Sequence, residues 1–226
     1  EEKMAAYGLG IVFLIAESDW YAVLMENKQV SWFTKPATML ALLVWLVMSA
    51  GLSGKLKWFG FALIFGLIGD IFLLLPHKFF IAGLVSFFMG HCAYLAGFYF
   101  DITHGKFFPM VVFSLLLALM LYRVAPVILG GLHKKSTARK MKLPVIAYMT
   151  ILSLMVFFAL TTLFRTDWKP SAAGLAASGA LLFFCSDSML AYREFVKDFP
   201  KAHFWVRITY HLAQIALASA AALNFS

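Results

Sequence analysis

Two aspartates sit inside long apolar runs of this sequence and are its best candidates for chemistry. Asp70 lies about six residues before Pro76, and Asp187 lies at a comparable depth in its own run. Six helical residues at about 1.5 Å each place Asp70 about 9 Å inside the end of its helix. A charged group in hydrocarbon costs at least about 2.5 kcal/mol, so an intramembrane carboxyl indicates a functional site. The pair predicts acid–base chemistry; the alternative is that each carboxyl only binds a neighbouring helix.

Other polar residues recur on single faces of the apolar segments that would surround these aspartates. His91 and Tyr94 follow a helical spacing with small residues, and small residues allow helices to approach closely. We expect such polar side chains to point into the helix bundle, where ordinary hydrogen bonds between helices are the simpler alternative. They are His91, Tyr94, Ser186, Arg207, Tyr210, His211 and Gln214.

The composition indicates a membrane protein. Of 226 residues, 62% are hydrophobic and only 13% are charged, whereas soluble domains are nearer half apolar and a quarter charged. The net charge of +8 does not predict nucleic-acid binding, because Lys and Arg beside membrane spans usually reflect topology and contact with anionic lipid. The two cysteines, Cys92 and Cys185, cannot form a disulfide framework or a cysteine-rich metal site.

The apolar runs predict an all-α, polytopic membrane protein with about eight transmembrane helices. They are too long and do not alternate, which excludes strands. Pro36 and Pro144 are expected in the first turn of the second and sixth helices, where the missing N–H costs nothing. We expect one transmembrane domain over residues 1–226, with helices at about 5–25, 31–50, 57–75, 79–100, 107–129, 143–164, 172–192 and 203–223.

The distribution of charge predicts the orientation of the chain. Most of the 19 lysines and arginines lie in the connections between helices 1–2, 3–4, 5–6 and 7–8, so the positive-inside rule places both termini outside the cytoplasm. Asp70 and Asp187, like His91 and His211, are separated by about half the chain. This spacing suggests two parallel four-helix repeats, although chance alignment of polar residues would also produce it.

Several charged residues fall near the predicted cytoplasmic ends of the spans. Lys35, Arg123 and Arg207 could hold a lipid phosphate through charge-assisted hydrogen bonds, or each could simply extend to the interface. For Glu17 and Asp19 we favour a solvated position near the cytoplasmic interface over a position at the mouth of a cavity.

The order of these residues resembles the YhhN-like membrane proteins, which include the lysoplasmalogenases. The resemblance covers the predicted helices 2 to 8. Its pieces are Lys35-Pro36, Gly66-x-x-Gly69-Asp70, Gly83-x-x-Ser86-Phe87-x-x-Gly90-His91-x-x-Tyr94, Tyr148, Gly179 with Ser186-Asp187-Ser188, and Tyr210-x-x-x-Gln214.

The resemblance implies an eight-helix membrane enzyme that hydrolyses the vinyl-ether bond of lysoplasmalogens. The products are a fatty aldehyde and a glycerophospho head group, and Asp70 and Asp187 would be the catalytic pair. It further implies a lysophospholipid substrate with an ethanolamine or choline head group, contact with membrane lipids, and no cofactor or metal. The protein would be a monomer or homodimer in the bacterial inner membrane or, in a eukaryote, the endoplasmic reticulum. Substrate-binding candidates are Lys35, His91, Tyr94, Arg123, Tyr148, Ser186, Arg207, Tyr210, His211 and Gln214.

The predicted site also suits this reaction on chemical grounds. Vinyl-ether hydrolysis needs a protonated acid, and burial together with a nearby second carboxylate favours a protonated aspartate. One aspartate would donate the proton while the other stabilises the resulting cation or activates water. The sequence leaves open which aspartate is the acid.

Two other classes of function remain open at this stage. Paired intramembrane carboxyls also suit a proton-coupled transporter. Asp70, His91, Asp187 and His211 could together bind zinc in a metal-dependent lipid hydrolase, although no two histidines are spaced on one helical turn. Motifs of serine lipases and of nucleotide-driven pumps are absent from the sequence. A purely structural role is the remaining alternative.

Overall fold

The computed structural model describes residues 2–99, 107–134 and 138–226. Within these ranges the chain forms eight long α-helices and two 3₁₀ turns, and no strand. The predicted all-α fold is confirmed, and each predicted segment overlaps one helix. The helices are α1 (Glu2–Leu24), α2 (Lys28–Ala50), α3 (Leu56–Leu74), α4 (Phe80–Phe98), α5 (Phe107–His133), α6 (Ala138–Thr161), α7 (Pro170–Phe195) and α8 (Ala202–Phe225), and the turns are η1 (His77–Phe79) and η3 (Thr162–Phe164).

Helices α2 and α6 begin earlier than the sequence predicts, so the expected positions of two prolines are wrong. Pro36 and Pro144 lie inside their helices rather than in the first turn. Helix α2 begins earlier because the side chain of Asn27 accepts a hydrogen bond from the backbone N–H of Val30, the usual geometry of an N-cap. The helix then continues through Pro36, which has no backbone N–H to donate to the preceding turn.

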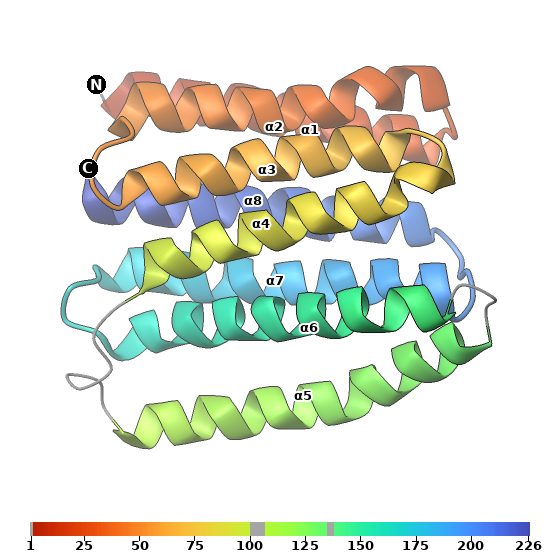
Figure 1. Ribbon diagram of the computed structural model, residues 1–226. Helices are drawn as coiled ribbons and strands as arrows, with labels where there is room; N and C mark the ends of the chain where they lie inside the picture. The colour runs from red at the N-terminus through yellow and green to blue at the C-terminus, as the bar shows by residue number, and fades with distance from the viewer. Residues whose placement is uncertain (1, 100–106, 135–137) are drawn as a thin grey trace.

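The helices lie side by side in one bundle, and the two termini lie at the same end of it (Figure 1). Helices α1 to α7 are each long and apolar enough to cross a membrane, and the protein is an integral multi-pass membrane protein. Helix α8 does not reach the same hydropathy, because Arg207, His211 and Gln214 interrupt it, yet it packs along α7. The placement of both termini outside the cytoplasm stays a prediction.

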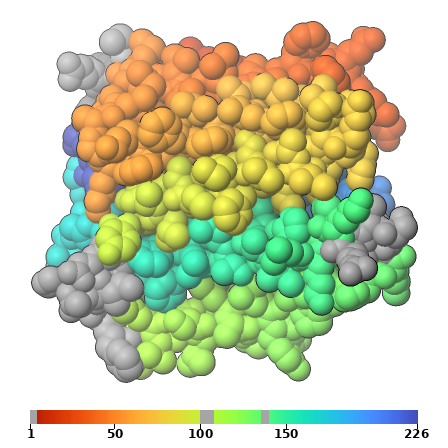
Figure 2. All heavy atoms as spheres, viewed as in Figure 1, coloured from red at the N-terminus to blue at the C-terminus, as the bar shows by residue number. Residues whose placement is uncertain are grey.

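Helix pairing follows the order of the chain. The consecutive pairs α1–α2, α3–α4, α5–α6 and α7–α8 pack together, and α2–α8 and α4–α6 join the pairs to one another. These contacts map onto each other under a shift of four helices, as two parallel repeats would require; the repeat itself stays a hypothesis. Helix α5 packs mainly against α6 and α7 and forms one edge of the molecule (Figure 2).

Small residues allow the closest of these contacts. A Cβ atom added to Gly69 of α3 would lie 2.7 Å from the ring of Phe87 on α4. A Cβ atom on Gly131 of α5 would lie 2.5 Å from the backbone oxygen of Phe195 on α7. Because backbone cannot move aside as easily as a flexible side chain, Gly131 fixes how closely the end of α5 approaches α7.

We predict that Gly131→Ala destabilises the protein and that Gly130→Ala does not. The added methyl group at Gly131 has no room and should lower the free energy of unfolding by about 1–3 kcal/mol. Nothing lies within 4 Å of a Cβ atom on Gly130, so alanine there should be neutral or stabilising by up to about 1 kcal/mol, through its better helix propensity. Thermal unfolding in detergent, followed by tryptophan fluorescence, measures both; equal melting temperatures would contradict the close α5–α7 contact.

Candidate active site

A polar cavity opens at the end of the bundle opposite the two termini and reaches into the interior. It encloses about 710 Å³ and is lined by residues from α1, α2, α3, α4, α7 and α8. The α1–α2, α3–α4 and α7–α8 connections surround its mouth. Both membrane aspartates line it, together with four more of the predicted site residues: Lys35, Ser186, Arg207 and Tyr210.

Asp70 is held by an ion pair with Lys35. Lys35 Nζ on α2 lies 2.8 Å from Asp70 Oδ1 on α3, and the side chains are only 8% and 1% exposed. Apart from this ion pair, neither Asp70 oxygen has a hydrogen-bond partner among the described residues. The Lys35 ammonium therefore does not extend to the interface, which was the simpler sequence expectation, because the buried carboxylate is its counter-ion.

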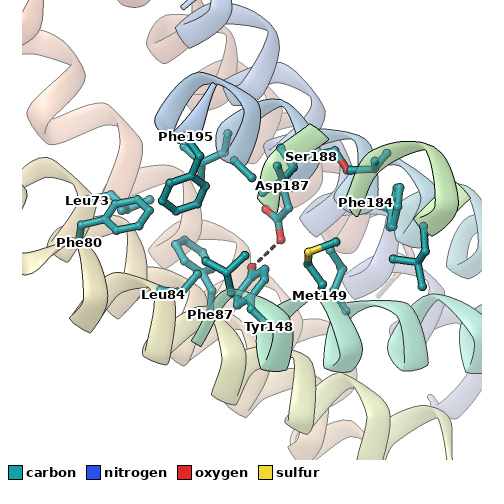
Figure 3. Close-up of a pocket in the computed structure, with 17 residues that line it drawn as sticks. Leu73, Phe80, Leu84, Phe87, Tyr148, Met149, Phe184, Asp187, Ser188 and Phe195 are labelled. Atoms are coloured by element: carbon teal, nitrogen blue, oxygen red, sulfur yellow. Dashed lines mark hydrogen bonds between the residues drawn. The ribbon is translucent and has the colours of Figure 1, made fainter. Parts of the chain in front are cut away.

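Asp187 has a different set of partners. The Tyr148 hydroxyl on α6 donates a hydrogen bond of 2.5 Å to Asp187 Oδ2 on α7, and the two side chains point toward each other in Figure 3. His91 Nε2 on α4 lies 3.0 Å from the Tyr148 hydroxyl and 3.2 Å from the same carboxylate oxygen. With its hydrogen on Nε2, His91 donates to this pair. Side chains from α4 and α6 thus hold the carboxyl group that α7 carries.

A chain of hydrogen bonds connects α4 to the Tyr210 hydroxyl on α8. The Tyr94 hydroxyl donates to Gln214 Oε1, and Gln214 Nε2 donates to the Tyr210 hydroxyl at 3.3 Å. Ser186 Oγ donates to the backbone oxygen of Val206 and so joins α7 to α8. Tyr94 and Gln214 are each 1% exposed and support the cavity wall from behind, while Tyr210 is part of the wall.

His211 does not join His91. Its Nδ1 accepts a hydrogen bond of 3.1 Å from Trp20 Nε1 on α1, and it does not line the polar cavity. The set of Asp70, His91, Asp187 and His211 considered for zinc is therefore not assembled, and no group of three or more His, Cys, Asp or Glu side chains that could hold a metal occurs in the described ranges.

The sequence prediction that Asp19 is solvated is wrong. It is completely buried, and Arg207 Nη1 lies 2.9 Å from its Oδ1 and 2.7 Å from its Oδ2. The hydroxyls of Ser31 and Thr34 also donate to Oδ1, at 3.1 and 2.8 Å. Glu17, by contrast, is exposed. The Arg207 charge is thus already matched by an internal carboxylate, which the sequence alone did not reveal.

The mouth of the cavity carries charged residues that the sequence reasoning did not select. Arg193 at the end of α7 has its Nη1 2.7 Å from His203 Nδ1, and His77 pairs with Glu194 at 2.9 Å. The sequence feature that could have indicated these residues is the grouping of basic residues at the helix ends on the predicted cytoplasmic side. Arg123, predicted as a phosphate ligand, is exposed on α5 and does not line the cavity.

A second, narrow cavity lies mainly between α4, α5, α6 and α7, and we call it the apolar slot. It encloses about 60 Å³, and its 17 lining residues include Leu84, Met149 and Phe184 (Figure 3). Its polar lining residues are Tyr148, Asp187 and Ser188. Five residues line both the slot and the polar cavity: Leu73, Phe80, Phe87, Asp187 and Leu190.

A comparison of the sequence with known families matches one of them. The family model described as YhhN matches residues 30–221, most of the chain. The chain belongs to the YhhN family. It is 27% identical to the human (Homo sapiens) lysoplasmalogenase TMEM86B over 92% of this chain and 84% of that protein. It is 30% identical to the mouse (Mus musculus) lysoplasmalogenase TMEM86B, over 94% of this chain and 85% of the relative. No solved structure matches.

Nine residues that carried the sequence resemblance to this family gather around the two cavities. They line a cavity directly or connect to its wall through one or two hydrogen bonds, whereas Arg123 and His211, which were not part of that resemblance, lie elsewhere. The nine are Lys35, Asp70, His91, Tyr94, Tyr148, Ser186, Asp187, Tyr210 and Gln214.

We predict that Arg207→Met strongly destabilises the YhhN family member. The Asp19 carboxylate would remain buried with only hydroxyl donors, and removing one partner of a buried ion pair typically costs about 3–5 kcal/mol. The double variant Asp19→Leu, Arg207→Met should recover most of the loss, because two apolar side chains can replace a buried pair. Thermal unfolding in detergent measures both.

The control for this prediction is the ion pair between Arg165 and Asp167. Asp167 is about half exposed, and the hydrogen bond from Arg165 holds its pKa below the usual range. Asp167→Asn should cost less than Arg207→Met, because the Asp167 side chain is 53% exposed and the asparagine oxygen can still accept a hydrogen bond from Arg165, which is 6% exposed. Similar losses in Arg207→Met and Asp167→Asn would argue against a structural role for the buried pair.

Proposed function

We propose that this chain is an intramembrane lysoplasmalogenase. It would hydrolyse the vinyl-ether bond of a lysoplasmalogen to a fatty aldehyde and a glycerophospho head group. The observation that carries the proposal is that Asp70 and Asp187 both line one cavity inside a membrane bundle. The relatives named lysoplasmalogenases, matched over most of the chain, support it.

The chemistry requires one proton donor and one proton acceptor. The donor adds a proton to the double-bond carbon that is not bonded to oxygen, and the other carbon becomes an oxocarbenium ion. Water adds to that cation and gives up a proton to the acceptor, which leaves a hemiacetal. The hemiacetal breaks its bond to the glycerol oxygen and yields aldehyde and alcohol. One water is consumed, the hydroxyl proton of the hemiacetal ends on the released alcohol, and the proton held by the acceptor returns to the donor before the next turnover.

The two aspartates have different surroundings, and we base different proposed roles on them. Asp70 Oδ1 lies 2.8 Å from Lys35 Nζ, and in this proposal the Asp70–Lys35 pair accepts the proton of water. Asp187 Oδ2 is occupied by the hydrogen bond from Tyr148, whereas Oδ1 has no partner among the described residues. A proton on Asp187 would therefore sit on Oδ1. In this proposal Asp187 is the acid, and Tyr148 and His91 orient it.

The head group would occupy the polar cavity near its mouth. Lys35 and Arg207 are both paired with internal carboxylates, so neither has a free charge for a phosphate. Arg193 is hydrogen-bonded to His203 and lines the cavity, which makes it the better candidate. Because both aspartates belong to one bundle, a single chain would suffice for catalysis. Which membrane contains the protein depends on the source organism, and the bacterial inner membrane or the endoplasmic reticulum stays a prediction.

We predict that Asp70→Asn and Asp187→Asn each abolish aldehyde release from alkenyl-glycerophosphoethanolamine. Each substitution preserves shape but removes a proton-transfer group, and such groups typically contribute about 10²–10⁴-fold to a rate. Glu17→Gln changes an exposed carboxyl on α1 and serves as the matched control with unaltered activity. Fatty aldehyde is measured in detergent with and without EDTA, and unfolding temperatures verify that each variant is folded.

The outcomes of this assay separate the alternatives. Normal activity in the Asp70→Asn, Asp187→Asn double variant would contradict the proposed pair. Activity lost with EDTA and restored by zinc would favour a zinc-dependent hydrolase. No aldehyde from the folded wild type, with solute transport in proteoliposomes, would favour a proton-coupled transporter.

A further inference from the structure

The polar cavity and the apolar slot share part of their walls. Of the five residues that line both, Leu73, Phe80, Phe87 and Leu190 are apolar. Asp187 is thus the one polar residue in the shared wall. A molecule that lies partly in each cavity would cross this shared wall, where Asp187 is the one polar side chain.

A lysoplasmalogen has the shape that such a pair of cavities would accept. Its glycerophospho part is polar, its alkenyl chain is apolar, and the vinyl-ether bond joins the two. Resting on the proposed function, we propose that the apolar slot binds the alkenyl chain and sets which chain lengths are hydrolysed. The head group then lies in the polar cavity, and the bond between the two parts lies at Asp187.

Helix α5 forms one wall of this slot. Leu121, Val124 and Ile128 supply the α5 side of the wall. In its most apolar stretch only 11% of the residues of α5 are buried, against 44% in α6 and α7. Most of α5 therefore lies outside the bundle interior, and in this proposal the alkenyl chain enters the slot from the bilayer beside α5.

The length of the slot along α7 can be compared with the length of an alkenyl chain. Its residues on α7 run from Phe184 to Phe195, which corresponds to about 16 Å along the helix axis at about 1.5 Å per residue. Asp187 lies between these two ends. A bulky side chain placed on the α5 wall would therefore block a long chain and leave room for a short one.

The test compares chain-length preference in Val124→Trp with that in wild type. Alkenyl-glycerophosphoethanolamines of about 16 and about 8 carbons serve as substrates, because a clash with even a few methylenes changes kcat/KM by about 10–200-fold. In Val124→Trp we expect kcat/KM for the long chain to fall about tenfold or more, while that for the short chain changes less than about twofold. Leu119→Trp, at an exposed position of the same helix, is the matched control and should behave as wild type.

A second variant keeps the test decisive should Val124→Trp not fold. Leu121→Ala widens the slot and should raise the rate for a branched alkenyl chain relative to a straight one. An unchanged ratio in Leu121→Ala, or an equal loss for both chain lengths in Val124→Trp, would overturn the assignment of the slot and leave the proposed function intact. Absence of aldehyde from every substrate with wild type would instead refute the proposed function.

Discussion

A carboxylate inside a hydrocarbon layer must be paired, and the three buried aspartates of this bundle are paired in three ways. Asp19 binds the guanidinium of Arg207 and two hydroxyls, Asp70 binds the ammonium of Lys35, and Asp187 is held by Tyr148 and His91. These groups connect α1, α2 and α8, then α2 and α3, and finally α4, α6 and α7. Helix α5 is the one helix whose described residues enter none of them, and it is also the least buried. The paired charges therefore connect every helix except α5, whose described residues pack through apolar contacts.

The same constraint gives the two cavity aspartates different chemistry. Asp70 lies beside the amino group of Lys35, whereas Asp187 lies against aromatic and aliphatic side chains with a phenol and an imidazole as partners. Under the proposed function, these different neighbours are the basis for giving the two carboxyl groups opposite parts in a proton transfer. The difference arises from helix packing: α2 brings an amino group to one carboxyl, and α4 and α6 bring an imidazole and a phenol to the other.

Much of the fold follows from local patterns, and much of the site does not. Long apolar runs separated by basic connections suffice to predict the helices, and Asp70 and Asp187 stand out because charge in such runs is costly. Pro36 predicts a start of α2 that is too late, because the helix already begins after its N-cap residue Asn27. The pair of Asp19 with Arg207 joins helices at opposite ends of the chain. No periodicity encodes such a contact, so the sequence predicts a solvated Asp19 and leaves Arg207 either extended to the interface or bound to a lipid phosphate, and the pairing of the two is seen only in the fold.

The composition of the apolar slot has a further consequence for a protein that would release an aldehyde. Aldehydes condense with amines to form imines, and a lysine or cysteine beside the product would be modified by it. None of the 17 residues that line the slot is a lysine or a cysteine. Lys35, the nearest buried amine of the site, lies in the polar cavity and is engaged by Asp70. Under the proposed function, the reactive product would be retained among side chains inert toward it until it passes into the lipid, so the architecture protects the protein from its own chemistry.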